Sequence, residues 1–263
     1  MTTLDDAYAN AAHIPAAEDY PPRWEAAAAA FREGLGTRAQ VGLSYGASPR
    51  QKVDLFHPEG VPQGTMVFVH GGYWKAFDRS TWSHLAAGAL AANWAVALPG
   101  YDLCPDVRIP QITRQIAAAV TDIADRTDGA IVLAGHSAGG HLVARMLDDR
   151  LLRDAVLRRI ERVAPISPVA DLSPLLQTSM NEILQLTPED AHAESPVNMA
   201  ASGGAAVHVW VGAEERPVFL EQAAALAAAW DVPHTVVPET HHFDVIDALE
   251  DPESDLLRFL TGR

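Results

Sequence analysis

One segment near the middle of the chain carries most of the information about the fold: Gly135-His136-Ser137-Ala138-Gly139. It follows an apolar, β-branched run at residues 131–134, and a helix-like segment begins at Gly140. A sharp turn between a buried strand and a helix strains its central residue, and the glycines avoid steric clash where the chain folds closely on itself. We therefore predict that Ser137 Oγ is presented at the end of a strand, where the following helix N-terminus favours developing negative charge. The alternative is a serine that only caps the helix.

Strand-like and helix-like runs alternate on both sides of this segment. Besides 131–134, the strand-like runs are residues 41–45, 53–56, 66–69, 94–98, 163–166, 207–211 and 235–237. The helix-like segments are residues 82–92, 112–124, 140–147, 219–230 and 255–260. This alternation predicts right-handed crossovers and a mostly parallel sheet that is covered on both faces. The first two runs follow each other closely, which predicts an antiparallel hairpin at one edge.

The composition indicates a single globular domain over residues 1–263. The chain is 48% hydrophobic and 20% charged, and a chain of this length buries a large core without a disulfide or a metal. The first 38 residues, with an alanine-rich stretch at 26–30, predict a helical arm. Residues 167–204 are punctuated by proline and serine, which predicts a small lid or pocket wall. The alternative for that segment is a structural loop excursion.

The charge and the remaining composition exclude several classes of partner. A formal net charge of -15 repels phosphate backbones and anionic membrane surfaces. No apolar run approaches the roughly 20 residues that span a bilayer, and the N-terminus lacks the features of a signal peptide. We expect a cytoplasmic protein that acts on a small molecule without a cofactor; the oligomeric state is left open, with a homodimer as one outcome. The one cysteine, Cys104, has no partner for a redox or zinc motif and is interpreted as a small buried side chain.

A second glycine-rich loop, His70-Gly71-Gly72-Tyr73-Trp74, follows the run at residues 66–69. Successive glycines let backbone N–H groups converge on one point, which the oxyanion of an acyl-transfer reaction requires. By position, we assign these donors to Gly72 and Tyr73, joined by Ala138 directly after the serine. We predict that His70 braces the loop by hydrogen bonding. The loop lacks the Lys-Ser/Thr pair of a P-loop and the third glycine of a dinucleotide fingerprint, so phosphate binding is rejected.

A nucleophilic serine needs a histidine base and an acid that holds the tautomer of that histidine. His241 and His242 follow the last predicted strand and are the candidates for the base. Glu214 and Glu215 follow the strand before it, and Asp171 follows an earlier one. The order serine, acid, histidine matches hydrolases with a serine elbow.

Several stretches together resemble the arylformamidase (kynurenine formamidase) group of α/β-hydrolases. That group shares an HGGxW loop, a GHSAGGHL-like elbow and an HFxxx histidine segment, which match residues 69–74, 135–142 and 242–246 here. Residues 8–15 and 101–105 are also similar, so the likeness covers nearly the whole chain. The resemblance implies one α/β-hydrolase domain: a mostly parallel eight-stranded sheet flanked by helices, with an antiparallel N-terminal edge and a small lid.

The resemblance also implies individual roles. Ser137 is the implied nucleophile, and His242, which precedes Phe243, is the implied general base. The implied acid lies four residues before Phe219, at Glu215. The family often has aspartate there, so the acid of this chain is longer by one methylene.

The activity that the resemblance implies is hydrolysis of a small N-formyl arylamide, with N-formyl-kynurenine as the family's substrate. Tyr73 and Trp74 then stack on the aryl ring of the substrate, or they pack the loop against the core. A carboxylesterase with the same triad is the nearest alternative. A non-catalytic receptor would be expected to lose a triad or oxyanion residue, and a metal-dependent amidohydrolase would need a further ligand cluster.

Overall fold

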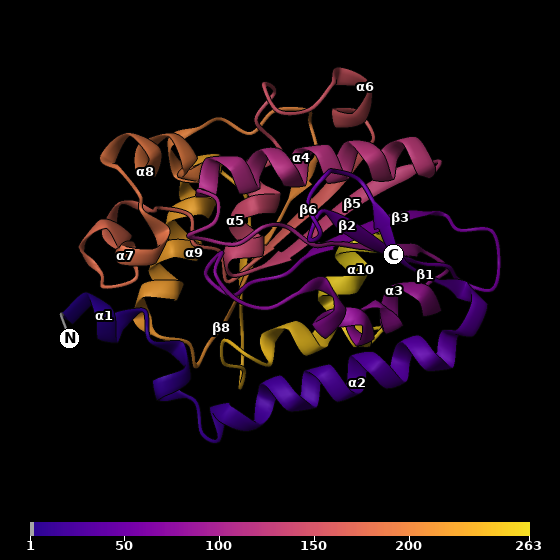
Figure 1. The fold of residues 1–263 in the computed structure, drawn as a ribbon, viewed down its shortest axis with the longest axis horizontal. Coiled ribbons are helices and arrows are strands. Elements are labelled where there is room, and N and C mark those ends of the chain that lie inside the picture. The colour runs from indigo at the N-terminus through magenta and orange to yellow at the C-terminus, as the bar shows by residue number, and fades with distance from the viewer. Residues whose placement is uncertain (1–2) are drawn as a thin grey trace.

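The computed structural model describes residues 3–263, and a mixed sheet runs through their centre (Figure 1). The sheet has nine strands in the order β1-β2-β4-β3-β5-β6-β8-β9, and β7 pairs with β6 beside this path. The strands are β1 (Ala39–Ser44), β2 (Lys52–Phe56), β3 (Gly64–Val69), β4 (Ala95–Pro99), β5 (Ala130–His136), β6 (Ile160–Ile166), β7 (Ala206–Val207), β8 (Val209–Gly212) and β9 (His234–Val237).

The predicted sheet is confirmed, with one difference. β1 is antiparallel to β2 and β2 is antiparallel to β4, whereas the other pairs are parallel. The expected single strand at residues 207–211 is two strands, so the described residues form nine strands instead of eight. The pairing with β6 is interrupted at His208, because β7 pairs with β6 at Val163 and β8 does so only at Ile166.

Helices cover both faces of the sheet, and the strands alternate between the two cores. In β5, Ile131 and Leu133 belong to one core, and Val132 and Ala134 belong to the other, as the two-residue period of a strand requires. In Figure 1, α4 lies above the sheet and α2 below it. The first core is packed by α4 (Ile109–Arg126), α5 (Ala138–Arg145) and α9 (Pro217–Trp230). The second is packed by α2 (Tyr20–Leu35), the 3₁₀ helix η4 (Arg79–Ala86), α3 (Ala87–Ala91), the 3₁₀ helix η7 (Val245–Glu250) and α10 (Asp255–Thr261).

The predicted helical arm precedes the sheet; its first two residues lie outside the described residues. It consists of α1 (Thr3–Ala7), the 3₁₀ helices η1 (Asn10–His13) and η2 (Ala17–Asp19), α2, and the 3₁₀ helix η3 (Gly36–Arg38). No helix among residues 3–263 is both long enough and apolar enough to cross a membrane.

The segment at residues 167–204, where the sequence predicted a small lid or pocket wall, contains only short helices. After α6 (Asp154–Leu157) and β6, the chain forms η5 (Ser173–Gln177), α7 (Asn181–Leu184), α8 (Pro188–Glu194) and η6 (Pro196–Asn198). Buried polar contacts fasten α8 to the body of the protein. The Glu194 carboxylate accepts hydrogen bonds from Thr113 Oγ1 (2.6 Å) and Arg145 Nε (3.3 Å), and the Glu194 carbonyl accepts one from His141 Nε2 (2.8 Å).

Candidate active site

Ser137 lies at the turn between β5 and α5 with φ 55° and ψ −116°, which confirms the predicted strained turn. Its N–H donates to the Ile166 carbonyl (2.8 Å), and its carbonyl accepts from the His141 N–H (3.0 Å). Gly139 explains why the turn is so tight: a Cβ at this position would lie 1.9 Å from the Val69 carbonyl oxygen. The serine is therefore held at the carboxyl end of β5 by backbone contacts on both sides.

Glu215 and His242 form a buried pair at the ends of two strands farther along the sheet, beyond β6. Glu215 follows β8 and His242 follows β9, and His242 Nδ1 donates to Glu215 Oε2 at 2.5 Å. Glu215 Oε1 accepts from the Gly212 N–H (2.9 Å) and from Ser167 Oγ. Burial raises the pKa of Glu215, but the charge of His242 and these hydrogen bonds outweigh it and hold that pKa below its usual value. The carboxylate is thus ionised and fixes the tautomer of His242, with Nε2 free to accept a proton.

The other sequence candidates have different partners. Glu214 is exposed. Asp171 accepts from the Ser173 N–H (2.9 Å) at the start of η5. His241 pairs through Nε2 with the Tyr20 hydroxyl (3.0 Å). Among residues 3–263, no group of three or more histidine, cysteine, aspartate or glutamate side chains is arranged to hold a metal ion.

Two contacts of this pair were not predicted from the sequence. Ser167 directly follows β6, has φ 47° and donates to Glu215. Its position after a strand next to β5 is the signal that could have identified it. The centroid of the His242 ring lies 4.6 Å from that of His136 and 4.4 Å from that of Phe219, so two rings pack against His242. Burial, with the neighbouring His242, holds the pKa of His136 well below its usual value, so this ring is neutral.

The glycine loop abuts the serine. A Cβ on Gly71 would lie 2.9 Å from the His136 carbonyl oxygen and 3.0 Å from Ser137 Cβ. The next three residues have positive φ: Gly72 at 106°, Tyr73 at 48° and Trp74 at 56°. The structure thus brings this loop against Ser137, which directly precedes Ala138, the first residue of α5.

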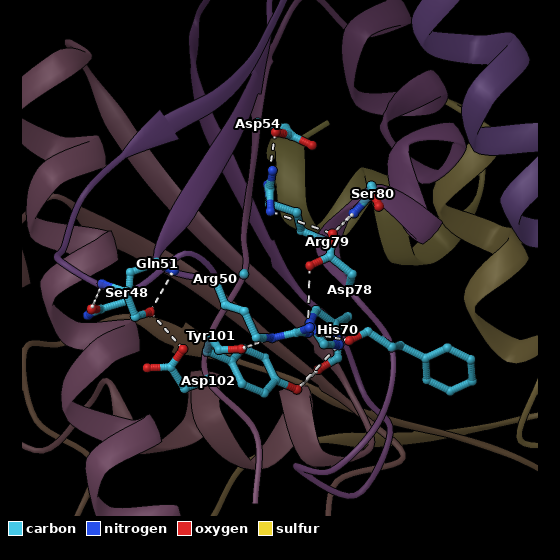
Figure 2. A network of polar contacts seen from close by, with 12 residues as sticks. Ser48, Arg50, Gln51, Asp54, His70, Asp78, Arg79, Ser80, Tyr101 and Asp102 are labelled. Atoms are coloured by element: carbon cyan, nitrogen blue, oxygen red, sulfur yellow. Dashed lines mark hydrogen bonds and ion pairs between the residues drawn. The ribbon is translucent and has the colours of Figure 1, made fainter. Parts of the chain in front are cut away.

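His70 braces this loop, as predicted. Its Nδ1 donates to the Gly71 carbonyl (2.7 Å), and its ring stacks on Tyr101 with a centroid distance of 4.4 Å. The Tyr101 hydroxyl in turn donates to the His70 carbonyl (2.9 Å), and Arg50 Nε donates to the Tyr101 carbonyl (2.8 Å). Figure 2 shows this network continuing through Asp78. Burial lowers the pKa of His70 to about 4, so it is a neutral structural residue at pH 7.

A cavity of about 790 Å³ opens at Ser137 and His242, and both residues line it. Within the described residues they share no direct hydrogen bond, which is common before substrate is bound. The volume of the cavity is typical of small-molecule sites. The wall is rich in aromatic side chains that come from separate parts of the chain: Trp24, Tyr73, Phe77, Trp82 and Phe243.

The position of Trp74 corrects the prediction that it contacts the substrate. Tyr73 lines the cavity, and its hydroxyl donates to the Tyr8 carbonyl (2.7 Å). Trp74 is 0% exposed, does not line the cavity, and packs edge-on against His141 at 5.1 Å. The successive positive φ angles turn these neighbouring side chains to different sides, so Trp74 packs the loop against the core.

The N-terminal arm forms a large part of the cavity wall, which the sequence did not predict. The predicted wall at residues 167–204 contributes Met180. Lining residues of the arm extend from Tyr8 to Trp24. The Tyr8 hydroxyl accepts from Gln222 Nε2 of α9 (2.9 Å), which ties the arm to the body of the protein.

Comparison with known proteins agrees with this geometry. A family profile described as the alpha/beta hydrolase fold matches residues 66–238. The chain belongs to the α/β-hydrolase fold family. The match includes the glycine loop, the serine turn and Glu215, and the arm and His242 lie outside it.

Several known proteins are similar to this α/β-hydrolase. It is 27% identical over 237 residues to kynurenine formamidase of Salmo salar, covering 84% of this chain and 80% of the relative. It is 60% identical to a Silicibacter protein whose crystal structure carries a provisional description as a thioesterase, with a TM-score of 0.98 and coverage of 99% and 100%. Esterase B of Lactobacillus Rhamnosis, at 19% identity and a TM-score of 0.67 with coverage of 96% and 91%, shares the fold. These relatives confirm the resemblance to arylformamidase-like α/β-hydrolases that the sequence motifs predicted.

Proposed function

We propose that this protein is a serine hydrolase that cleaves a small N-formyl arylamide, with N-formyl-kynurenine as the substrate, through a Ser137-His242-Glu215 triad. The observation that carries the proposal is one cavity lined by Ser137, by the Glu215-paired His242 and by an aromatic wall. Such a wall suits an aryl ring held beside the reacting group. The kynurenine formamidase named among the relatives gives independent support.

In the first step, Ser137 Oγ attacks the formyl carbon while His242 Nε2 takes its proton. Glu215 stabilises the imidazolium that forms, as its buried ionised carboxylate allows. The N–H groups of Gly72, Tyr73 and Ala138 hold the oxyanion of the tetrahedral intermediate. Each donor in such a site contributes about 3 kcal/mol to transition-state stabilisation.

In the second step, the C–N bond breaks and His242 gives its proton to the departing arylamine nitrogen. The formyl group remains on Ser137 as an ester. His242 then takes a proton from a water molecule that attacks this ester, and the proton returns to Ser137 as formate leaves. The products are the free arylamine and formate.

The test compares kcat/KM for N-formyl-kynurenine with kcat/KM for p-nitrophenyl acetate, with formate release measured directly. We expect the formamide to be the better substrate by at least about tenfold. Turnover of the formamide no faster than the uncatalysed rate would reject it as the substrate. Ser137→Ala is expected to abolish both reactions and labelling by a fluorophosphonate probe. An unlabelled wild-type protein would instead favour a non-catalytic receptor.

Hydrolysis of a short-acyl ester or thioester by the same triad is the second candidate. It is favoured by the thioesterase description of the relative at 60% identity. The triad does not distinguish these substrates, because the shape of the cavity selects the leaving group. A short-acyl thioester assayed beside the other two substrates decides between them by kcat/KM.

A further inference from the structure

Asn10, on the arm, is a buried polar residue of the cavity wall that the proposed chemistry does not use. Asn10 is 6% exposed and lines the cavity. Within the described residues, neither Oδ1 nor Nδ2 has a hydrogen-bond partner. A buried carboxamide without partners is costly, and native proteins keep few of them. A polar group on a bound ligand would give these atoms the partners that the protein does not supply.

The position of Asn10 relative to the glycine loop is fixed. The Asn10 N–H donates to the Tyr8 carbonyl (3.1 Å), and this same carbonyl accepts from the Tyr73 hydroxyl (2.7 Å). Tyr73 belongs to the loop that abuts Ser137. Asn10 is therefore anchored to the proposed oxyanion loop through one shared carbonyl, as a residue that positions a substrate must be.

Charged groups of both signs line the same cavity. Lys75 is half-buried, and among residues 3–263 no carboxylate lies within ion-pair distance of its ammonium group. Glu18 is exposed and also lines the cavity. In a protein with a net charge of -15, an unpaired lysine in an apolar cavity is a local attraction for a carboxylate. A glutamate in the same wall offers a partner for an ammonium group.

We propose that Asn10 and Lys75, with Glu18, form a subsite for an α-amino-acid head group on the substrate. Lys75 and Asn10 Nδ2 bind the carboxylate, and Asn10 Oδ1 and Glu18 bind the ammonium group. An asparagine side chain offers both the donors and the acceptor that this head group needs. This subsite deepens the proposed function, on which it rests, because it selects amino-acid aryl formamides over simple ones.

The test measures equilibrium binding by ligand-observed NMR titration, so it does not depend on turnover. The two ligands are kynurenine and 2-aminoacetophenone, which has the aryl ketone without the amino-acid head. We expect wild type to bind kynurenine at least about tenfold more tightly. Asn10→Ala and Lys75→Met are each expected to weaken kynurenine binding by about 10- to 100-fold. The Kd of 2-aminoacetophenone should stay within about twofold.

Lys52→Met is the matched control, because Lys52 does not line the cavity; its Kd values should equal those of wild type. Unfolding midpoints for each variant show that the fold is intact, and Asn10→Leu provides a second variant that removes the amide without shrinking the side chain. The subsite proposal would be overturned if wild type bound the two ligands with equal affinity or did not bind them. It would also be overturned if the variants lost affinity for both ligands equally. Turnover of N-formyl-kynurenine, measured in parallel, separates the two proposals: discrimination without turnover rejects the formamidase and keeps the subsite.

Discussion

Replacing Glu215 with glutamine tests whether this residue sets the tautomer of His242. In wild type, Oε1 accepts from the Gly212 N–H (2.9 Å) and from Ser167 Oγ, and Oε2 accepts from His242 Nδ1 (2.5 Å). A glutamine has one acceptor oxygen. Keeping that oxygen on the Gly212 and Ser167 side turns its NH₂ group toward Nδ1. The His242 proton then moves to Nε2, and the histidine can no longer accept a proton from Ser137.

The size of the effect follows from two limits. The wrong tautomer in a serine triad costs about 10⁴-fold in rate, or about 5.5 kcal/mol. The amide can escape by flipping, so that its oxygen faces His242, but the buried Gly212 N–H then loses its acceptor at a cost of about 1–3 kcal/mol. Because of that cost, the flipped amide is a minor population. The smallest expected loss in kcat/KM is therefore near tenfold. We therefore expect Glu215→Gln to lower kcat/KM by about 10- to 10⁴-fold.

The assay is kcat/KM on p-nitrophenyl acetate and N-formyl-kynurenine, together with the rate of fluorophosphonate labelling of Ser137. Glu214→Gln is the matched control, because the neighbouring Glu214 is exposed; it should keep wild-type rates. A loss smaller than about tenfold in Glu215→Gln, with the fold intact, would refute the assignment of this acid. A loss of the same size in the control would show that charge near the cavity matters instead of the tautomer.

Three further predictions follow from the local packing. Gly71→Ala should fold but lose about 10- to 100-fold in kcat/KM, because its Cβ would lie 3.0 Å from Ser137 Cβ and displace the oxyanion loop; wild-type kcat/KM would contradict this. N-ethylmaleimide should leave activity unchanged, because burial raises the pKa of Cys104 to about 11 and removes its thiolate. Burial lowers the pKa of His70 to about 4 and of His141 to about 3, so only the unfolded chain takes up these protons below pH 6.5. The free energy of unfolding should therefore fall as pH falls from 6.5 toward 4, by up to about 1.4 kcal/mol per pH unit for each histidine; equal urea midpoints at pH 7 and pH 5 would count against it.

The sheet and the turn around Ser137 were predictable because their signals are local. A strand of period two, a glycine turn and a helix leave marks within a few residues of each other, and those marks predicted β5, α5 and the strained turn at Ser137. The acid was harder to assign, because Glu214 and Glu215 differ by one position at the end of the same strand. Only the contacts of Glu215 with Gly212 and His242 separate them, and these depend on how β8 and β9 lie in space. The predicted contact of Trp74 with the substrate was wrong for a related reason. Two adjacent aromatic residues in a turn give no local sign of which one faces the core.

The cavity wall shows where sequence motifs stop being informative. The proposed reacting groups follow the ends of β5, β8 and β9, so the fold that the family shares brings them to one edge of the sheet. The wall opposite them comes from the arm, whose Trp24 contacts Phe243 at 5.3 Å and Trp82 at 4.7 Å across more than 200 and more than 50 residues of sequence. No short pattern records such contacts. Enzymes of this fold can therefore keep the serine turn and glycine loop while changing the arm, and with it the substrate. For this reason the residues of the arm, and Asn10 in particular, are better guides to what the protein cleaves than the triad itself.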